Sequence, residues 1–410
     1  MKSPQTATSR SFVRQELHRD ARVFIFVALT IAVMLTISTC HYHRSLDSNI
    51  GLTVTPLDLS KAEEMDTFKN LPSPELRKHS IAANGYYLTG VIYRTGRTNE
   101  SDPLSISVFG RRSSDKGLAW ATQITVDDFT PAISAEAYAS SSSEQSAAST
   151  GPIRQAPWTA SPNGEYVAFR LNGFSKSLTY VAVVDTSTGE VVQTTHVTRR
   201  VIGMELTDTH LAVETADQLF PGGAGNATLT VLSLSQHDSP PTALPTTQWL
   251  IGASHRSFLM SDSLQSNTCT GESCIPRKVS CIDGRGRTIS TVDGIIHIHS
   301  GGWMLQYSDP TTASSLFSQI YDSASQQERD AARDQLAGIR LEIMDPDSGR
   351  RTDVTGLHVS EVGLPTGAGL LALKQVPSDD ANAKYAPVFW LSSTDDGHPH
   401  TENLEQFENN

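Results

Sequence analysis

Alternating apolar and polar residues recur in short stretches after residue 80, and a turn rich in Gly, Asn, Asp or Ser opens each stretch. The clearest copy is SPNGEYVAFR at Ser161–Arg170, followed by LTYVAVVDTSTGEVV at Leu178–Val192. A period of two is typical of strands that bury one face. The tripeptide Pro162-Asn163-Gly164 suits a tight turn, because these residues accept dihedral angles that β-branched residues resist. The pattern therefore predicts antiparallel strands joined by short turns.

Five looser copies of this unit surround the clear one, and they begin at Ala82, Leu206, Ala253, Ser300 and Pro365. The middle copies follow one another at about 45 residues, the period expected of four-stranded propeller blades. The Ser161–Val192 unit resembles the TolB-like or WD40-like β-propeller repeat, in which Asn163 replaces the usual Asp. The resemblance implies an all-β fold, a β-propeller of about six four-stranded blades, give or take one. A pair of β-sandwiches or another meander is the alternative.

One segment has a different pattern: Val23–Cys40 contains no charged side chain. As a helix it measures roughly 27 Å, about the thickness of the hydrocarbon core of a bilayer. Five Lys or Arg precede it, which predicts a cytoplasmic N-terminus and an extracytoplasmic bulk. We therefore expect a single-pass signal anchor in the cell membrane. A lipoprotein signal ending at Cys40, a cleaved signal peptide and a buried core helix are the alternatives.

These patterns predict a linear domain organisation. Ser325 and Glu328 fit a helix capping box and Gly338 suits a helix C-terminus, so we expect a helical insertion in the repeat. The expected N-terminal parts are a basic cytoplasmic segment 1–22, a transmembrane helix 23–40 and a juxtamembrane linker 41–77. A propeller domain 78–394 follows, and it contains a low-complexity loop 135–151 and a helical insertion 314–338. An acidic tail 395–410 ends the chain.

The charge of the chain argues against nucleic-acid binding. Residues 1–44 hold six Lys or Arg and two acidic residues, so the remainder carries about −16 of formal charge within a total of −12. Phosphate binding needs clustered cations, which an acidic exterior does not offer. We therefore expect no nucleic-acid partner. The membrane itself and a protein or cell-envelope component are the expected partners.

Few residues suggest metal or redox chemistry. His297 and His299 lie two apart in a predicted strand, so both imidazoles project from one sheet face and could begin a metal site. Asp345 and Asp347 could offer oxygen ligands to Ca²⁺, although Asp-rich hairpin turns are also common for conformational reasons. One disulfide is possible in an oxidising compartment, between Cys269 and Cys274.

Recognisable catalytic motifs are missing from the sequence: no Gly-x-Ser-x-Gly elbow and no His-Glu-x-x-His helix occurs. The adjacent pair Ser254 and His255 is expected to lie in an ordinary turn. We therefore expect no catalytic residue and no cofactor, and a non-catalytic binding or scaffold module. The alternative is an extracytoplasmic hydrolase or lyase with its site in the propeller channel. That alternative requires carboxylates or histidines that converge from several blades.

Overall fold

The computed structural model describes residues 51–93, 103–127, 135–138, 157–172, 178–217, 227–235, 240–262, 276–362, 365, 367–377 and 384–392. The chain divides into two compact units, Met1–Asp47 and Ser48–Asn410, and all of the described residues belong to the second. The predicted membrane span Val23–Cys40 and the acidic tail 395–410 lie outside the described residues. Within those ranges, no helix has the length and hydropathy needed to cross a bilayer.

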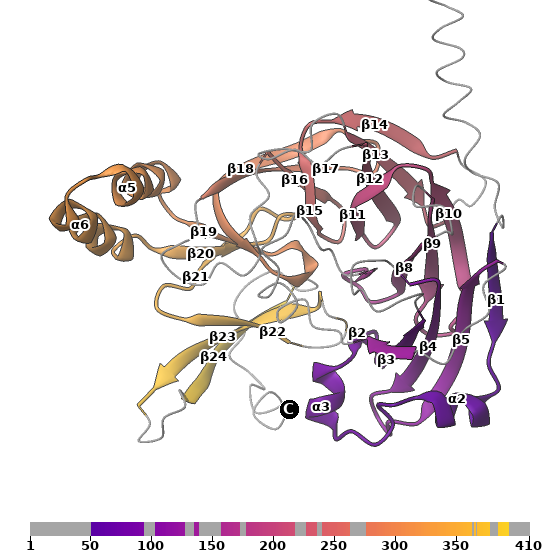
Figure 1. The fold of residues 1–410 in the computed structure, drawn as a ribbon. Helices are drawn as coiled ribbons and strands as arrows, with labels where there is room; N and C mark the ends of the chain where they lie inside the picture. The colour runs from indigo at the N-terminus through magenta and orange to yellow at the C-terminus, as the bar shows by residue number, and fades with distance from the viewer. Residues whose placement is uncertain are drawn as a thin grey trace, which may run out of the picture. The chain divides into compact units, whose positions relative to one another are not determined.

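Five antiparallel sheets, two of them with four strands, make up the described part of the second unit, as the alternating pattern predicted. Figure 1 shows them in chain order, from indigo to yellow. The first sheet contains β1 (Leu52–Pro56), β2 (Ile81–Ala83), β3 (Tyr86–Tyr93), β4 (Ser105–Arg112), β5 (Leu118–Val126) and β6 (Ala135–Tyr138). The second contains β7 (Trp158–Ala160), β8 (Tyr166–Asn172), β9 (Thr179–Asp185) and β10 (Val191–Val197). The third contains β11 (Arg200–Leu206), β12 (His210–Ala216), β13 (Ala227–Ser233) and β14 (Thr242–Thr246).

The fourth sheet joins seven strands because one long strand changes partner along its length. It contains β15 (Trp249–Ala253), β16 (Phe258–Ser261), β17 (Arg277–Ile282), β18 (Thr288–Ile298), β19 (Met304–Tyr307), β20 (Leu341–Met344) and β21 (Arg351–Asp353). Strand β18 pairs with β17 as far as Ile295 and with β19 from Ile295 onward. Gly294 precedes this change with φ +79°, a conformation that favours glycine. The fifth sheet contains β22 (His358–Val362), β23 (Gly369–Val376) and β24 (Lys384–Ser392).

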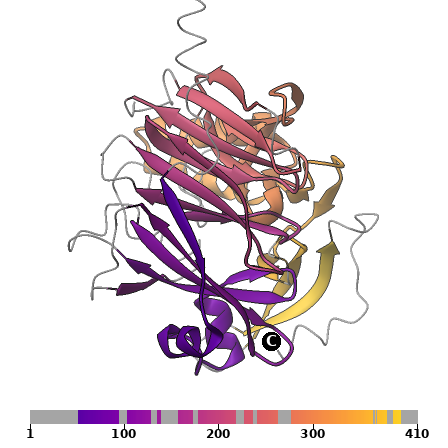
Figure 2. The same cartoon turned by 90° about the vertical axis from the view of Figure 1, so that its right-hand side faces the viewer.

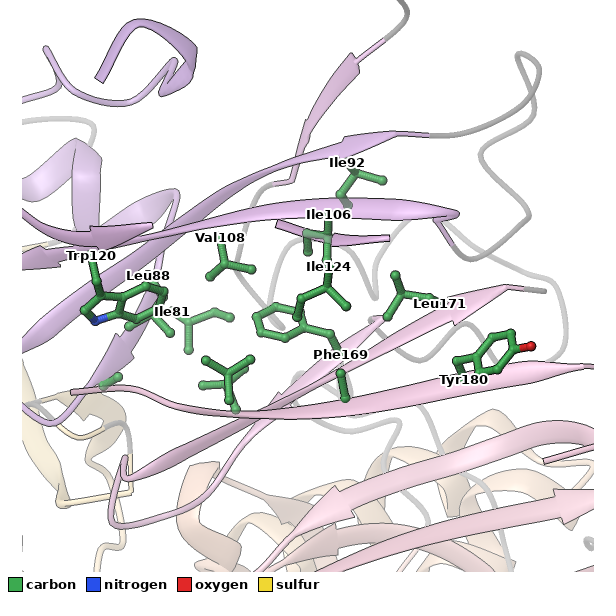
Figure 3. Close-up of a cluster of buried hydrophobic side chains, with 14 of the residues drawn as sticks. Ile81, Leu88, Ile92, Ile106, Val108, Trp120, Ile124, Phe169, Leu171 and Tyr180 are labelled. Carbon is green, nitrogen blue, oxygen red and sulfur yellow. The ribbon is translucent and has the colours of Figure 1, made fainter. Parts of the chain in front are cut away.

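A shared apolar core joins the first two sheets (Figure 3). Ile106 and Ile124 of the first sheet pack with Phe169 and Leu171 of the second, and each of these side chains is at most 1% exposed. Burying an aliphatic or aromatic side chain of this size contributes about 1.5–3 kcal/mol. The alternate apolar residues of these strands therefore form one face, and that face packs against the neighbouring sheet.

Trp120 shows how closely these two sheets approach. Its indole Nε1 donates a hydrogen bond of 2.9 Å to the carbonyl oxygen of Thr186 in the β9–β10 hairpin. Gly189 of that hairpin has φ +76°, and a Cβ there would lie 2.4 Å from the indole ring. Only glycine satisfies both conditions, so the hairpin sequence is adapted to the tryptophan of the neighbouring sheet.

The expected linker 41–77 instead forms structured elements where it is described. Strand β1 pairs with β5, and helices α2 (Leu59–Met65) and α3 (Ser73–Lys78) follow it. In Figure 2 these indigo helices lie at one end of the first sheet. Arg111 of β4 joins α2 to the sheet through buried Asp66 at 2.7 Å and Glu63 at 2.9 Å. The expected low-complexity loop 135–151 also begins as a strand, because β6 pairs with β3.

The predicted helical insertion 314–338 is present, but it begins earlier and contains two helices. These are α5 (Pro310–Asp322) and α6 (Gln326–Ala337), between β19 and β20. Asp309 caps α5, because its Oδ1 accepts a hydrogen bond from the Thr312 amide at 3.0 Å. Ser325 caps α6 by accepting from the Glu328 amide at 3.4 Å, as the capping box predicted. Phe317 and Leu336 pack into one apolar cluster between the two helices.

Candidate functional site

Turns between consecutive strands of successive sheets touch one another. A Cβ on Gly164 of the β7–β8 turn would lie only 2.6 Å from the Asn84 amide nitrogen of the β2–β3 turn. In the next turn, Asp208 accepts a 2.9 Å hydrogen bond from the Asn163 amide at Oδ1. The Oδ2 atom of Asp208 lies 2.7 Å from the His255 Nδ1 atom of the β15–β16 turn. These contacts connect four turns in series.

Close backbone approaches continue the series through the later turns. The short 3₁₀ helix η2 (Ser300–Gly302) lies between β18 and β19, and a Cβ on Gly302 would lie 2.9 Å from the Ser254 Cα. A Cβ on Gly301 would lie 2.9 Å from the Gly367 Cα, between β22 and β23. A Cβ on Gly367 would in turn lie 2.6 Å from the Cα of Pro162 in the second sheet. The last turn therefore meets the second.

We call this closed series the turn ring. It comprises the five turns that carry Asn163–Gly164, Asp208, Ser254–His255, Gly301–Gly302 and Gly367, and the turn that carries Asn84 touches it at Gly164. Any polar side chain placed in these turns is held near side chains from other sheets. The sheets therefore bring together residues that are far apart in the sequence, which is the condition for a site.

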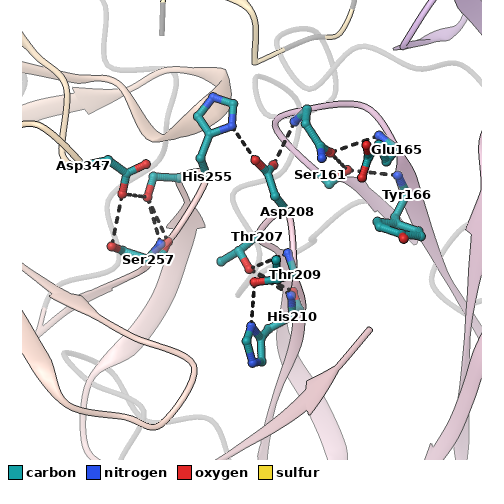
Figure 4. A network of polar contacts seen from close by, with 12 residues as sticks. Ser161, Glu165, Tyr166, Thr207, Asp208, Thr209, His210, His255, Ser257 and Asp347 are labelled. Carbon is teal, nitrogen blue, oxygen red and sulfur yellow. Dashed lines mark hydrogen bonds and ion pairs between the residues drawn. The ribbon is translucent and has the colours of Figure 1, made fainter. Parts of the chain in front are cut away.

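The Asp208–His255 pair is the most chemically distinctive contact of the turn ring (Figure 4). Its two side chains are 23% and 21% exposed, so solvent reaches both. Burial lowers the pKa of His255, but the hydrogen bond that its imidazole donates to Asp208 and the charges of Asp208, Asp347 and Asp345 outweigh this effect, so the pKa lies above its ordinary value of 6.5. A carboxylate on Nδ1 also fixes the tautomer, which makes Nε2 the basic nitrogen.

The β20–β21 hairpin contributes Asp347 to the same place (Figure 4). Its Oδ1 accepts hydrogen bonds from the Ser254 hydroxyl at 2.7 Å and from the Ser257 hydroxyl at 3.3 Å. Burial raises the pKa of Asp347 above the ordinary range, although these hydroxyls oppose the effect. Asp208, His255 and Asp347 thus converge from three different turns, and the sequence did not predict this convergence.

Two glutamates of the third sheet lie on the strands that lead into the turn ring. Glu205 of β11 accepts a 3.2 Å hydrogen bond from the Thr159 hydroxyl of β7 in the neighbouring sheet. Glu214 of β12 is fully buried, and its Oε2 accepts a 2.9 Å bond from the Leu250 amide. Burial raises the pKa of each carboxyl to about 7. Two carboxyl groups with a pKa close to neutral pH therefore lie on the strands that lead into the turn ring.

His297 and His299 come together as their spacing predicted, with ring centroids 4.3 Å apart. His299 Nδ1 lies 3.7 Å from Glu361 Oε1, and Glu361 also accepts from the Ser300 amide at 2.7 Å. Burial raises the pKa of Glu361, but hydrogen bonds from His299 and Ser300 outweigh it and hold the pKa at about 2. Glu361 is therefore a stable negative charge close to the His299 ring.

The other predicted site residues fall in different places. Asp345 accepts the Asp347 amide at 3.0 Å, the contact of an ordinary Asp-rich turn, and Asp347 reaches the serines of the β15–β16 turn. Cys269 and Cys274 lie outside the described residues, whereas Cys281 is a buried free thiol on β17. In the described parts of the chain, no group of three or more His, Cys, Asp or Glu is arranged to hold a metal ion.

The spacing of the repeats is the signal that could have identified the Asp208–His255 pair. Asn163 and Asp208 are 45 residues apart, and Asp208 and His255 are 47 residues apart. These residues occupy matching turns of successive units, and matching turns of neighbouring sheets meet in the turn ring. The adjacent Ser254 and His255 were correctly predicted to lie in a turn, but their partners Asp208 and Asp347 were not found.

Comparisons with known proteins find structural similarity only, since no family model and no curated protein matches the chain. The β-propeller domain of the Trilobed protease from Pyrococcus furiosus is 9% identical, with a TM-score of 0.35, over 76% of this chain and 84% of that one. Pyrococcus horikoshii acylaminoacyl peptidase is 13% identical, with a TM-score of 0.31, over 69% and 42%. Kuenenia stuttgartiensis hydrazine synthase is 15% identical, with a TM-score of 0.26, over 62% and 71%.

Several of the structural neighbours are peptidases. Prolyl and acylaminoacyl peptidases recur among them, and the chain spans less than half the length of those peptidases. These neighbours do not support the expected non-catalytic binding or scaffold module, and the peptidases among them belong to the class of the hydrolase alternative. The neighbours are β-propeller proteins, as the repeat indicated, without a specific link to the TolB-like or WD40-like families.

Proposed function

We propose that the chain is a hydrolase in which His255 is the acid–base group and Asp208 orients it. The observation that carries the proposal is the 2.7 Å contact between Asp208 Oδ2 and His255 Nδ1, made by two turns of different sheets and open to solvent. A third titratable group, Asp347, converges on the same place from a third turn. Histidine is the side chain whose ordinary pKa lies closest to neutral pH, which suits it to proton transfer there.

With its carboxylate partner, the imidazole can act as the base and then as the acid in a hydrolysis. With Asp208 on Nδ1, the Nε2 atom of His255 takes a proton from water as the water oxygen bonds to the substrate carbon. The same Nε2 then returns that proton to the leaving group as its bond to carbon breaks, so the atoms balance. The neighbouring carboxylates raise the pKa of His255 from its ordinary 6.5, which favours the protonated imidazole that gives its proton to the leaving group.

The charges around His255 favour an acyl bond, in an ester or amide, over a phosphoryl group. Asp208, Asp345 and Asp347 all act on the imidazole. Transfer of a phosphoryl group relies on cations that neutralise its oxygens, and three carboxylates repel such a substrate. An ester or an amide group carries no such charge, so the carboxylates do not repel it.

The test is hydrolysis of a panel of chromogenic acyl esters and aminoacyl anilides by the purified chain. We expect His255→Gln to lower kcat by about 10²–10⁴-fold, the usual contribution of an acid–base group. Asp208→Asn should also lower kcat, because it removes the charge that fixes the tautomer. His79→Gln, a histidine at the end of α3, is the matched control and should retain activity. Equal rates for His255→Gln and the control would overturn the proposal.

We also propose six blades for the second unit. The five turns of the turn ring and the Asn84 turn that touches it make six, and the partner change within β18 divides the fourth sheet into two meanders, β15–β18 and β18–β21. An experimental structure of the second unit tests the number directly. Five or seven meanders around the turn ring would contradict it.

Membrane anchorage by Val23–Cys40 remains a proposal that the uncharged run supports. We propose an extracytoplasmic location for the second unit. Alkaline carbonate washing should leave the protein in the membrane fraction, and protease added to intact cells or spheroplasts should digest the second unit. Release by carbonate, or protection from protease, would contradict the anchor or its orientation respectively.

A further inference from the structure

Asp347 touches the turn that carries His255 but does not touch the imidazole through any hydrogen bond described above. Its Oδ1 accepts from Ser254 Oγ at 2.7 Å and from Ser257 Oγ at 3.3 Å, on either side of His255. Ser254 is fully buried and Ser257 is 2% exposed, so these hydroxyls have little access to water. A buried hydroxyl pair needs a protein acceptor, and Asp347 supplies it from another meander.

Hydrogen bonds within the β15–β16 turn connect Ser254 to Ser257. The contact with Asp347 therefore also restricts His255, which lies between them. The Ser257 amide donates to Ser254 Oγ at 3.0 Å, and the Ser254 amide donates to the Ser257 carbonyl oxygen at 2.8 Å. The carbonyl oxygen of His255 accepts a 3.1 Å bond from the Asp208 amide. The backbone of His255 is therefore fixed from both sides, by Asp347 through the serines and by Asp208 directly.

Charge is the second way in which the hairpin acts on the imidazole. The carboxylates that affect His255 are Asp208 from the β11–β12 turn, and Asp345 and Asp347 from the β20–β21 hairpin. Arg256, the next residue along the turn, is exposed. A carboxylate near a partly buried imidazole favours the protonated form, because the interior screens charges less than water does.

We propose that Asp347 is a positioning residue for His255: it holds the β15–β16 turn through Ser254 and Ser257 and places a negative charge near the imidazole. This role rests on His255 being the acid–base group of the proposed function. It adds a third turn to the site, so that a residue from the β20–β21 hairpin sets the geometry and the proton affinity of a histidine on β15–β16. The charge and the hydrogen bonds are separable by substitution.

Asp347→Asn separates them, because its amide oxygen still accepts from the two serines while the charge is lost. We expect the NMR titration midpoint of His255 to fall by about 0.5 to 1 pH unit in this variant. Asp347→Ala removes the acceptor as well, and should lower the midpoint and broaden the turn resonances. Asp353→Asn, at the end of β21, is the control for a lost carboxylate on the same hairpin and should leave the midpoint unchanged. The His255 signal is assigned by its absence in His255→Gln.

The titration decides the role of Asp347 whether or not hydrolysis is found. If the purified chain hydrolyses an acyl substrate, the acidic limb of the kcat profile should move with the midpoint, with KM unchanged. An Asp347→Asn midpoint equal to that of Asp353→Asn would overturn the positioning role even in an active enzyme. A lowered midpoint in a chain that hydrolyses nothing would overturn the proposed function and leave the positioning of His255 intact.

Discussion

Glu214 leads to a quantitative prediction about stability and pH. Its carboxyl is fully buried between the third and fourth sheets, and the Leu250 amide is its hydrogen-bond donor. Burial raises its pKa from the ordinary 4.5 to about 7, so the folded state holds a proton that the unfolded chain releases above pH 4.5. At about 1.4 kcal/mol per pKa unit, the full effect is about 3.5 kcal/mol.

The sign follows from proton binding. The contribution of Glu214 to stability is complete below pH 4.5 and declines as the pH rises through about 7, because the unfolded chain then binds fewer protons than the folded chain. Glu214→Gln keeps an acceptor for the Leu250 amide and does not titrate. The free energy of unfolding of Glu214→Gln minus that of the wild type should therefore increase by about 2–3 kcal/mol from pH 5 to pH 8.

Urea denaturation at pH 5, 6, 7 and 8, followed by tryptophan fluorescence, measures this difference. Glu205 titrates in a similar range, but it is present in both proteins, so its effect cancels in the comparison. Glu190→Gln, on an exposed hairpin, is the control and should differ from the wild type equally at every pH. A difference between Glu214→Gln and the wild type that does not change with pH would refute the reasoning.

Two further predictions concern the packing of the first two sheets. Phe169→Ala should cost about 3–5 kcal/mol in urea denaturation, because it leaves a cavity in the core that these sheets share; a cost below 1 kcal/mol would contradict that packing. Arg111→Ala should cost about 3–5 kcal/mol, since it leaves buried Asp66 without its ion pair. Arg287→Ala breaks the exposed pair with Asp283 and should cost under about 1 kcal/mol, so equal costs would contradict the role of burial.

Local features of the fold were predictable from the sequence. The unit at Ser161–Val192 forms β8 and β9 with the expected turn at Asn163, because alternation and turn chemistry are properties of neighbouring residues. The capping box at Ser325 placed the start of α6 correctly for the same reason. The start of α5 was missed because Asp309 and Pro310 also read as part of a loop.

Contacts between distant residues were not predictable in the same way. The Asp208–His255 pair joins two turns 47 residues apart, and nothing in either turn specifies the other. Such a pair becomes visible only when successive repeats are aligned and their turns are taken to meet at one end of the sheets. Arg111 and Asp66 are likewise 45 residues apart, so the structured segment around α2 was taken for a linker.

The turn ring also determines where this protein can grow during evolution. Its turns are short, as in residues 207–209 and 254–257, and an inserted residue there would push neighbouring turns apart. At the opposite strand ends some connections are also short, such as residues 198–199 and 247–248, but residues 308–340 carry a whole helical pair. We therefore expect insertions at that end of the sheets and not in the turn ring. Descendants of this chain can diversify there without disturbing the histidine and carboxylates at the other end.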